Sequence, residues 1–186
     1  MITGILLAAG SGSRFGGGKL LHALPDGTPI GVASLRNLHA ALPAVIAVVR
    51  SDDDPLHALL AAQGITVCRC TDANLGMARS LVCGIEASRG ADAWVIALGD
   101  MPYVKPNTIK TIAARVARTG AIAVPLFHGM RGHPIGFGRR YLEELLSLQG
   151  DEGARSVITR HADELETIEL DDPGISQDID RHVDVK

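Results

Sequence analysis

Short apolar runs alternate with segments of helical periodicity along almost the whole chain, and this alternation constrains the fold more than any other feature. Strands that alternate with helices favour a mostly parallel sheet with helices packed on its faces. We therefore predict an α/β three-layer sandwich of the Rossmann-like type. The expected strands are residues 2–7, 45–49, 66–69, 93–98, 121–125, 135–137 and 166–170. The expected helices are residues 32–41, 55–63, 80–89, 106–118, 139–148 and 152–161.

Length and composition fit one domain spanning residues 1–186. A chain of 186 residues can bury one sizeable core, and no repeat, low-complexity tract or linker divides it. Hydrophobic residues make up 46 % and charged residues 21 % of the chain, as in ordinary soluble globular proteins. The net charge of −3 argues against a nucleic-acid partner, although one basic loop could still bind a nucleotide.

Three features favour a cytoplasmic location without a membrane partner. The apolar N-terminus lacks the basic residues of a signal peptide, and no run approaches the ~20 apolar residues that a membrane span needs. The cysteines Cys68, Cys70 and Cys83 form no disulfide framework, so we expect reduced, buried or half-buried thiols. Because Cys68 and Cys70 are two residues apart on an expected strand, they should share one of its faces.

A glycine-rich loop follows the first expected strand, at the edge of the sheet where ligands of open α/β folds bind. It runs Ala8-Ala9-Gly10-Ser11-Gly12-Ser13-Arg14-Phe15-Gly16-Gly17-Gly18-Lys19. Such a loop can bring backbone N–H groups close to phosphate oxygens, and Arg14 and Lys19 add cations suited to a triphosphate. The glycine spacing does not fit the dinucleotide-binding G-x-G-x-x-G pattern, and Leu20 stands where a Walker A loop requires Ser or Thr. A flexible surface loop is the alternative.

Carboxylates stand out at two places. Asp100 directly follows the best of the expected strands, so it projects into the expected crevice. Mg²⁺ needs only one or two carboxylates beside waters and phosphate oxygens, which makes Asp100 our candidate metal ligand, with a turn or helix cap as the alternative. Asp178 and Asp180 form a second acidic group, and both would lie on one face of an extended segment. A solvated acidic tail is the alternative there.

Two further segments carry ligand-binding signals. Residues 74–81 lead into the start of a helix, where anionic or polar ligand groups bind well, although a plain capped helix start would look the same. In residues 129–137, Arg131 offers a phosphate contact, and His133 is held extended by Pro134. Taken by itself, His133 is more often a structural hydrogen-bonding residue.

These segments together resemble one family over nearly the full chain. The glycine-rich loop resembles the A-A-G-x-x-x-R-M/F-G-x-x-K signature of nucleotidyltransferases related to the molybdenum cofactor guanylyl- and cytidylyltransferases. Gly-Asp-Met-Pro at 99–102 resembles the metal-binding segment of that family. Residues 177–184 resemble its D-I-D-T-P-E-D ending, with Arg-His-Val in place of Thr-Pro-Glu.

Other matches point to the cytidylyltransferase branch of the family. Gly76 and Ser80 match a G-x-x-x-S-L element that faces the nucleotide. Residues 132–137 resemble a G-H-P-x-x-F motif that lines the pterin side, and residues 150–155 resemble a G-D-x-G-A-R element. Residues 7–10 are Leu-Ala-Ala-Gly, so Ala9 stands where the guanylyltransferases carry the first Gly of L-A-G-G. This substitution resembles the CTP-using branch.

The resemblance implies a nucleotidyltransferase fold and a role for each matched residue. Arg14 and Lys19 neutralise phosphates, and Asp100 holds Mg²⁺ with Asp178 or Asp180 near the metal; Arg14, Lys19 and Asp100 form the implied catalytic set. The implied nucleotide-binding residues are Leu7, Ala8, Ala9, Gly10, Ser11, Gly12, Arg14, Lys19, Gly76, Ser80 and Asp100. The implied acceptor-binding residues are Arg131, His133 and Pro134.

The reaction implied is the transfer of CMP from CTP to the terminal phosphate of molybdenum-loaded molybdopterin, a phosphorylated pterin cofactor, with release of pyrophosphate. A molybdoenzyme or chaperone would be the protein partner. Three alternatives stay open. The acceptor or the nucleotide could differ, as in a sugar- or alditol-phosphate cytidylyltransferase or a GTP-dependent enzyme. The second alternative is a nicotinamide or flavin oxidoreductase, which NAD(P)H binding would test. The third is a non-catalytic nucleotide- or cofactor-delivery module, which pyrophosphate release would distinguish from an enzyme.

Overall fold

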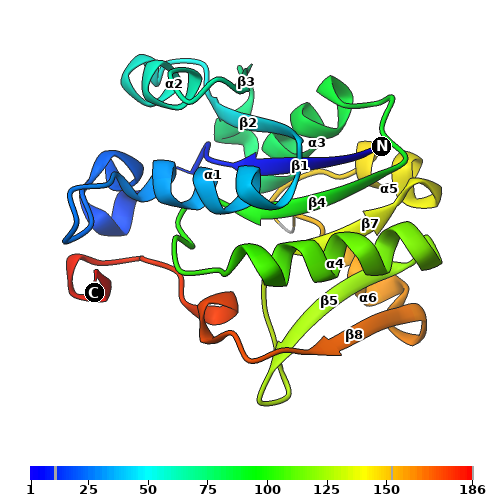
Figure 1. Cartoon of the computed structure of the whole chain (residues 1–186). Helices are drawn as coiled ribbons and strands as arrows, with labels where there is room; N and C mark the ends of the chain where they lie inside the picture. Colours follow the sequence, from blue (N-terminus) through cyan, green and yellow to red (C-terminus); the bar gives the residue numbers. More distant parts are fainter. Residues whose placement is uncertain (11, 152, 186) are drawn as a thin grey trace.

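A central β-sheet organises the computed structural model, which describes residues 1–10, 12–151 and 153–185 (Figure 1). The strands are β1 (Ile2–Leu7), β2 (Ala44–Arg50), β3 (Thr66–Cys70), β4 (Ala93–Leu98), β5 (Ile122–Phe127), β6 (Met130–Arg131), β7 (Ile135–Gly138) and β8 (Leu165–Glu169). Their order in the sheet is β3-β2-β1-β4-β7-β5-β6, with β8 beside β5. β1 to β4 are parallel to one another, β5 is parallel to β8, and β6 and β7 run in the opposite direction to the strands they pair with. The predicted mostly parallel sheet is therefore confirmed.

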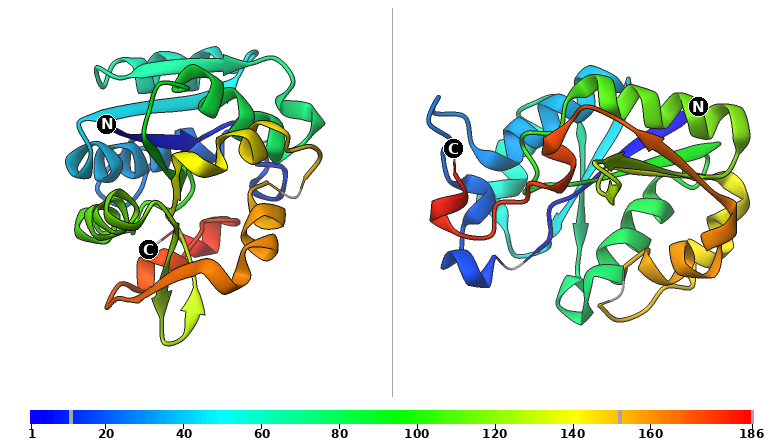
Figure 2. Two further views of the ribbon diagram at one scale, coloured as in Figure 1. Left: turned by 90° about the vertical axis from the view of Figure 1, so that its right-hand side faces the viewer. Right: turned by 90° about the horizontal axis from the view of Figure 1, so that it is seen from below.

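Helices cover both faces of the sheet. They are α1 (Ile30–Ala41), α2 (Asp54–Ala61), α3 (Met77–Ala87), α4 (Pro106–Thr119), α5 (Leu142–Leu146) and α6 (Arg155–Arg160). α1 and α4 lie on one face and α3, α5 and α6 on the other, so that the sheet is the middle of three layers (Figure 2). Among the helices of the described residues, none is long and apolar enough to cross a membrane.

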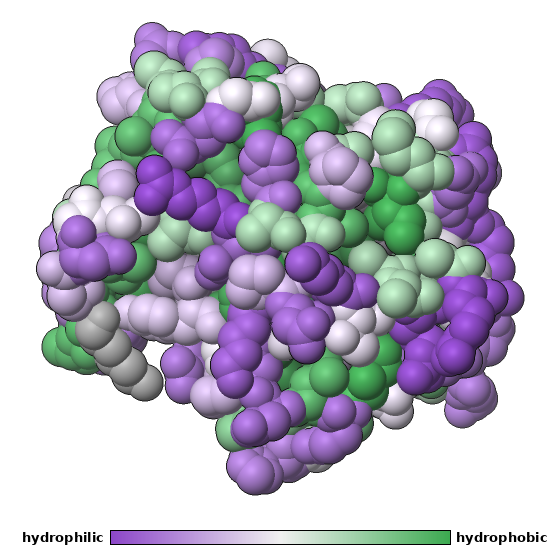
Figure 3. Space-filling model, in the orientation of Figure 1, coloured by the Kyte–Doolittle hydropathy of each residue, from purple (hydrophilic) through white to green (hydrophobic). Residues whose placement is uncertain are grey.

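Both faces of the sheet are buried, which explains why the strands are continuous apolar runs. On β1, Leu6 packs in the cluster that includes α1 and α4, while its neighbour Ile5 packs in the cluster that includes α3. The space between the layers is narrow: a Cβ on Gly84 of α3 would lie 2.7 Å from Ile5 Cγ2. Outside this core, polar side chains cover most of the face seen in Figure 3, with apolar ones in scattered patches.

The predicted elements match closely, with differences that have local reasons. The strands at 2–7 and 93–98 have the predicted bounds, and the other predicted strands differ by one or two residues. β6 was not predicted, because two residues cannot show a periodic pattern. The helix expected at 139–148 is a 3₁₀ turn, Arg139–Tyr141, followed by the short α5. The helix expected at 152–161 starts at Glu152, which lies outside the described residues, and α6 begins at Arg155.

The cysteines are buried or half-buried, as predicted. Cys70 is buried, and Cys68 and Cys83 are half-buried against the same hydrophobic cluster, so Cys68 and Cys70 share one face of β3. Burial is the largest cause that raises the pKa of the Cys83 thiol, to about 12. A thiol with so high a pKa carries almost no thiolate at neutral pH and is a poor nucleophile.

Candidate active site

The glycine-rich loop and Asp100 meet at the carboxyl-end edge of the sheet. β1 and β4 pair in register up to Leu7 opposite Leu98, so the segments after these residues leave the sheet side by side. Lys19 Nζ donates a hydrogen bond to Asp100 Oδ2 at 2.7 Å. The two side chains are only 12 % and 24 % exposed, so water screens this ion pair less than a surface pair. The structure thus brings together the cation and the carboxylate on which the sequence interpretation depends.

Glycine is required in the loop by the path of the backbone. Gly12, Gly16, Gly17 and Gly18 have φ angles of 58°, 94°, 93° and 61°, which other residues adopt only with strain. Gly10 is different, because its φ is not positive and nothing lies within 4 Å of the place a Cβ would occupy. Neither the backbone conformation nor the packing of the protein requires glycine at position 10.

A cavity of about 150 Å³ lies between the loop and Asp100. Most of the residues predicted to bind the nucleotide line this cavity. The lining residues are Leu7, Ala8, Ala9, Gly10, Gly12, Lys19, Leu20, Met77, Ser80, Leu98 and Asp100. Arg14 is absent from this lining and borders a neighbouring hollow of about 170 Å³ together with Lys19 and Asp180. Gly76 does not line the cavity but directly precedes Met77, and Ser11 lies outside the described residues.

Helix α1 holds the turn that carries Asp100. Ser34 Oγ donates to Gly99 O at 2.8 Å, and Asn37 Nδ2 donates to Pro102 O at 2.8 Å. The turn also approaches β1 closely, since Gly99 N donates to Leu7 O at 2.9 Å. Sequence reasoning missed Ser34 and Asn37, although their spacing of three residues places both on one face of the helix and was a signal that could have been used.

The acidic C-terminal segment packs against the loop. Asp180 accepts from Arg14 Nη1 at 2.8 Å and from Lys19 Nζ at 3.4 Å. The hydrogen bond from Arg14 is the largest cause that holds the pKa of Asp180 below its usual range. Ile179 N donates to Asp100 O at 2.9 Å, so the segment is also tied to the Asp100 turn. The alternative of a solvated acidic tail is therefore wrong for Asp180, whereas Asp178 is exposed.

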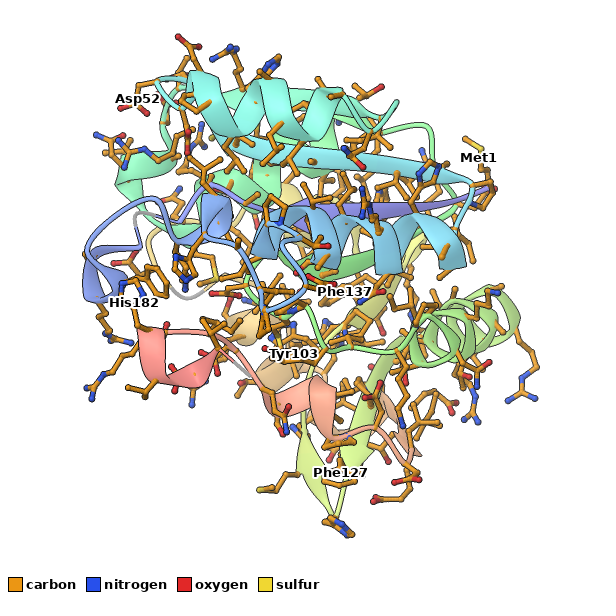
Figure 4. All side chains as sticks on the ribbon, turned by 60° about the vertical axis from the view of Figure 1, so that its left-hand side comes forward. Met1, Asp52, Tyr103, Phe127, Phe137 and His182 are labelled. Carbon is orange, nitrogen blue, oxygen red and sulfur yellow. The ribbon has the colours of Figure 1, made fainter. Side chains whose placement is uncertain are left out.

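Three aromatic side chains pack together between the C-terminal turn and the glycine-rich loop. The ring centroids of Phe15 and His182 are 3.9 Å apart, and His22 lies 5.2 Å from Phe15 and 5.0 Å from His182. Figure 4 shows His182 between the C-terminal turn and the loop. The histidines are not spaced in the sequence as metal ligands are. His22 and His182 are 160 positions apart, so no local pattern predicts that they pack together.

His133 lies beside the carboxylates of the site. Its backbone N donates to Ile175 O at 2.9 Å, whereas its buried Nδ1 has no hydrogen-bond partner among the described residues. Burial lowers the pKa of His133, and the charges of Asp100 and Asp178 oppose this shift. Pro134 is buried next to it. A neutral imidazole whose Nδ1 has no partner keeps one free hydrogen-bonding position.

Arg131 lies apart from the other predicted residues. It is exposed on β6, opposite Leu126 of β5, on the hairpin whose Phe127 lies at the lower edge of Figure 4. It lines neither of the two hollows at the loop. The structure therefore leaves its predicted contact with the acceptor phosphate untested.

The segment around residues 150–155 packs on the start of α3. Gly150 O accepts from Ala78 N at 3.1 Å, which satisfies one of the free N–H groups of the helix start. Gly76 has a φ of 117°, and a Cβ there would lie 2.3 Å from Gly150 O. The start of α3 is thus capped by another segment of the chain, while Met77 and Ser80 on its first turns still face the cavity.

The carboxylates fit a divalent cation that is bound together with phosphates. Asp100 and Asp180 both contact Lys19 Nζ, so they are close enough to share one cation. No cluster of three or more His, Cys, Asp or Glu side chains suited to a metal occurs in the described part of the chain. Two carboxylates completed by phosphate oxygens and water are what Mg²⁺ prefers, in contrast to a closed all-protein site.

Residues 4–165 match the model of the MobA-like NTP transferase domain. The chain belongs to this family. The purine catabolism protein PucB of Bacillus subtilis (strain 168) is 33 % identical to it over 168 residues, which are 84 % of this chain and 80 % of PucB. The family and the fold make the protein a nucleotidyltransferase that takes an NTP as substrate.

Solved structures agree with this assignment. Rv0371c from Mycobacterium tuberculosis H37Rv superposes with a TM-score of 0.86 at 29 % identity, covering 98 % of this chain and 94 % of that one. A manganese complex of Rv0371c from the same strain gives a TM-score of 0.81 at 28 % identity, with 98 % and 95 % covered. That protein therefore binds a divalent metal, the class of ion that the Asp100 and Asp180 carboxylates suit.

Proposed function

We propose that this protein transfers CMP from CTP to the terminal phosphate of molybdenum-loaded molybdopterin and releases pyrophosphate. One observation carries the proposal: the ion pair between Lys19 and Asp100 at the cavity of the glycine-rich loop. A cation suited to phosphates and a carboxylate suited to a metal lie within reach of one triphosphate, which supports the proposal. The family supports the nucleotidyl transfer, and the sequence motifs of the cytidylyltransferase branch support CTP and the pterin acceptor.

The protein's contribution to this reaction is positioning and charge neutralisation. An oxygen of the acceptor phosphate forms a bond to the α-phosphorus of CTP, and the bond from that phosphorus to the bridging oxygen of the β-phosphate breaks. The acceptor phosphate is already ionised at neutral pH, so no general base is needed. Lys19 and Arg14 donate hydrogen bonds to the phosphate oxygens, where negative charge accumulates as pyrophosphate leaves.

Asp100, together with Asp180 or Asp178, would hold the Mg²⁺ of this site. The ion supplies positive charge that neutralises the triphosphate. Lys19 and Arg14 already contact these carboxylates, so the phosphates arrive at a site whose cations are in place. Holding the cations in advance lowers the reorganisation that the reaction requires.

The acceptor would bind on the His133 side of Asp100. His133 Nδ1 is buried and free to pair, and Pro134 packs next to it. We propose that these residues contact the pterin and that Arg131 contacts its phosphate. A molybdoenzyme or its chaperone in the cytoplasm would receive the product, since a cofactor dinucleotide has to reach the enzyme that uses it.

The deciding experiment measures pyrophosphate release with Mg²⁺, each NTP in turn, and molybdenum-loaded molybdopterin or sugar and alditol phosphates as acceptors. We expect release with CTP and the pterin acceptor. A preference for GTP would show that the protein is a guanylyltransferase. Turnover with a sugar phosphate alone would show that the acceptor is a sugar phosphate and not the pterin. Tight CTP binding without pyrophosphate release from any acceptor would indicate a delivery module instead.

Substitution of Lys19 or Asp100 tests the site itself. Lys19→Ala and Asp100→Ala should each reduce turnover by roughly 10²-fold or more, as removal of a transition-state electrostatic contact does. The matched controls are Lys110→Ala and Asp163→Ala, which remove the same charges from exposed positions and should leave turnover unchanged. Near-normal turnover of either site variant would contradict the assignment.

A further inference from the structure

Asp172 is a buried carboxylate that none of the roles above uses. It lies at the start of the segment after β8, residues 170–185, which we call the C-terminal strap. The strap runs from α4 to the glycine-rich loop and carries Asp178 and Asp180 (Figure 1). Asp172 is only 1 % exposed, and a buried carboxylate is costly unless its oxygens are paired.

Three donors from two segments satisfy Asp172. Oδ2 accepts from Lys105 N at 2.9 Å and from Thr108 Oγ1 at 2.6 Å, and Oδ1 accepts from Gly174 N at 3.0 Å. Lys105 immediately precedes α4, whose own N-cap provides no side-chain hydrogen bond. Asp172 therefore caps α4 from a distant part of the chain, where the helix dipole also favours its negative charge.

This cap joins the two segments that carry the site carboxylates. Residues 100–105 lead from Asp100 to the start of α4, and they contact the strap at Asp100, Tyr103 and Lys105. Near α4, Gly174 lies so close to Tyr103 that a Cβ on it would be 2.2 Å from Tyr103 O. Near the site, Ile179 N donates to Asp100 O at 2.9 Å, and the Ile179 side chain is fully buried.

We infer that Asp172 is a positioning residue for the metal site, because it fixes the strap against the Asp100 turn and so sets the separation of Asp180 from Asp100. The inference rests on the proposed metal role of these two carboxylates. Ligands that come from two segments hold a metal well only when both segments are held in place. Asp172 itself contacts neither the cavity nor Lys19.

Asp172→Asn tests this role with little change of shape. The amide keeps one acceptor oxygen, but its NH₂ group would face backbone N–H groups or the Thr108 hydroxyl, so at least one of the three hydrogen bonds is lost. We expect the dissociation constant of Mn²⁺, measured by EPR in the presence of CTP, to rise about 10- to 100-fold, as for other changes behind metal ligands. CTP binding measured with EDTA should change much less.

Two further variants separate positioning from stability. Thr108→Val removes one donor and keeps the carboxylate, so it should weaken Mn²⁺ binding in the same direction by a smaller factor. Phe137→Leu alters a buried side chain on the other face of the sheet. It should lower the melting temperature without changing Mn²⁺ binding. If Asp172→Asn does not fold, Thr108→Val carries the test.

The outcomes distinguish this inference from the proposed function. The positioning role would be overturned if Asp172→Asn lowered the melting temperature but left Mn²⁺ binding unchanged. The same result in Thr108→Val would overturn it if Asp172→Asn does not fold. The proposed function would stay intact in either case. If the wild-type protein neither binds Mn²⁺ with CTP nor releases pyrophosphate, the proposed function fails, and the inference fails with it. Weakened Mn²⁺ binding in both variants, with normal binding in Phe137→Leu, supports it.

Discussion

At the residue scale, the site is a set of opposite charges that stabilise each other. Lys19 lies between Asp100 and Asp180, and Arg14 contacts Asp180 from the loop. A triphosphate and a divalent cation carry the same two signs of charge, so the triphosphate suits the cationic side chains of this set and the metal suits its carboxylates. The sequence indicated Lys19 and Asp100 correctly as neighbours, since both follow strands at one edge of the sheet. It did not distinguish Asp180 from Asp178.

The pKa of Asp180 gives a prediction at this scale. Arg14→Gln should raise the pKa of Asp180 toward the ordinary value of 3.8, because the largest cause of its lowering is removed. A lowered pKa means that the carboxylate stabilises the fold above about pH 4 and that this stabilisation is lost as the pH falls through the lowered value. Carbon NMR titration of the carboxyl groups measures the pKa, and urea unfolding at a series of pH values measures the stabilisation.

The control for this titration is Arg36→Gln, which changes an exposed arginine paired with Gln63. The Asp180 pKa should stay low in that variant. An unchanged Asp180 pKa in Arg14→Gln would show that the guanidinium does not hold this carboxylate in solution.

At the element scale, the start of α3 depends on a glycine. Gly76 has a φ of 117°, and a Cβ on it would collide with Gly150 O. The sequence showed Gly76 only as part of a motif, whereas its partner comes from a segment more than seventy positions away. Periodicity predicted α3 but placed its start at residue 80, three residues beyond its actual start at Met77. The apolar stripe in fact begins in the first turn, since Ala78 is buried on the same face as Leu81 and Ile85.

Gly76→Ala should destabilise the protein by about 2–6 kcal/mol. Backbone strain contributes about 1–3 kcal/mol, and the clash with Gly150 contributes about as much again. Because Met77 and Ser80 line the cavity, nucleotide affinity should fall as well. Thermal unfolding and CTP titration measure the two effects.

Gly90→Ala is the matched control, since its φ is not positive and nothing lies within 4 Å of the added Cβ. Its stability should lie within about 0.5 kcal/mol of wild type. Equal stabilities of the Gly76 and Gly90 variants would mean that the 150–151 segment moves aside without cost.

At the scale of the whole molecule, one sheet connects all parts of the chain, and we predict that residues 1–186 unfold as one domain. Trp94, the only tryptophan of the sequence, is fully buried on β4, near the middle of the sheet. Its fluorescence reports on the core, whereas far-UV circular dichroism reports on all helices and strands. The two urea transitions should therefore coincide. Separate midpoints would contradict a single cooperative unit.

The sequence by itself determined the alternation of strands and helices, the bounds of β1 and β4, and the glycine-rich composition of the loop. These features depend on apolar periodicity and on glycine, which act over a few residues. Only the tertiary structure decided that β7 inserts antiparallel between β4 and β5, that His182 packs on Phe15, and that Asp172 caps α4. Such contacts join segments far apart in the chain, and their energies come from packing and buried hydrogen bonds that leave no periodic trace in the sequence.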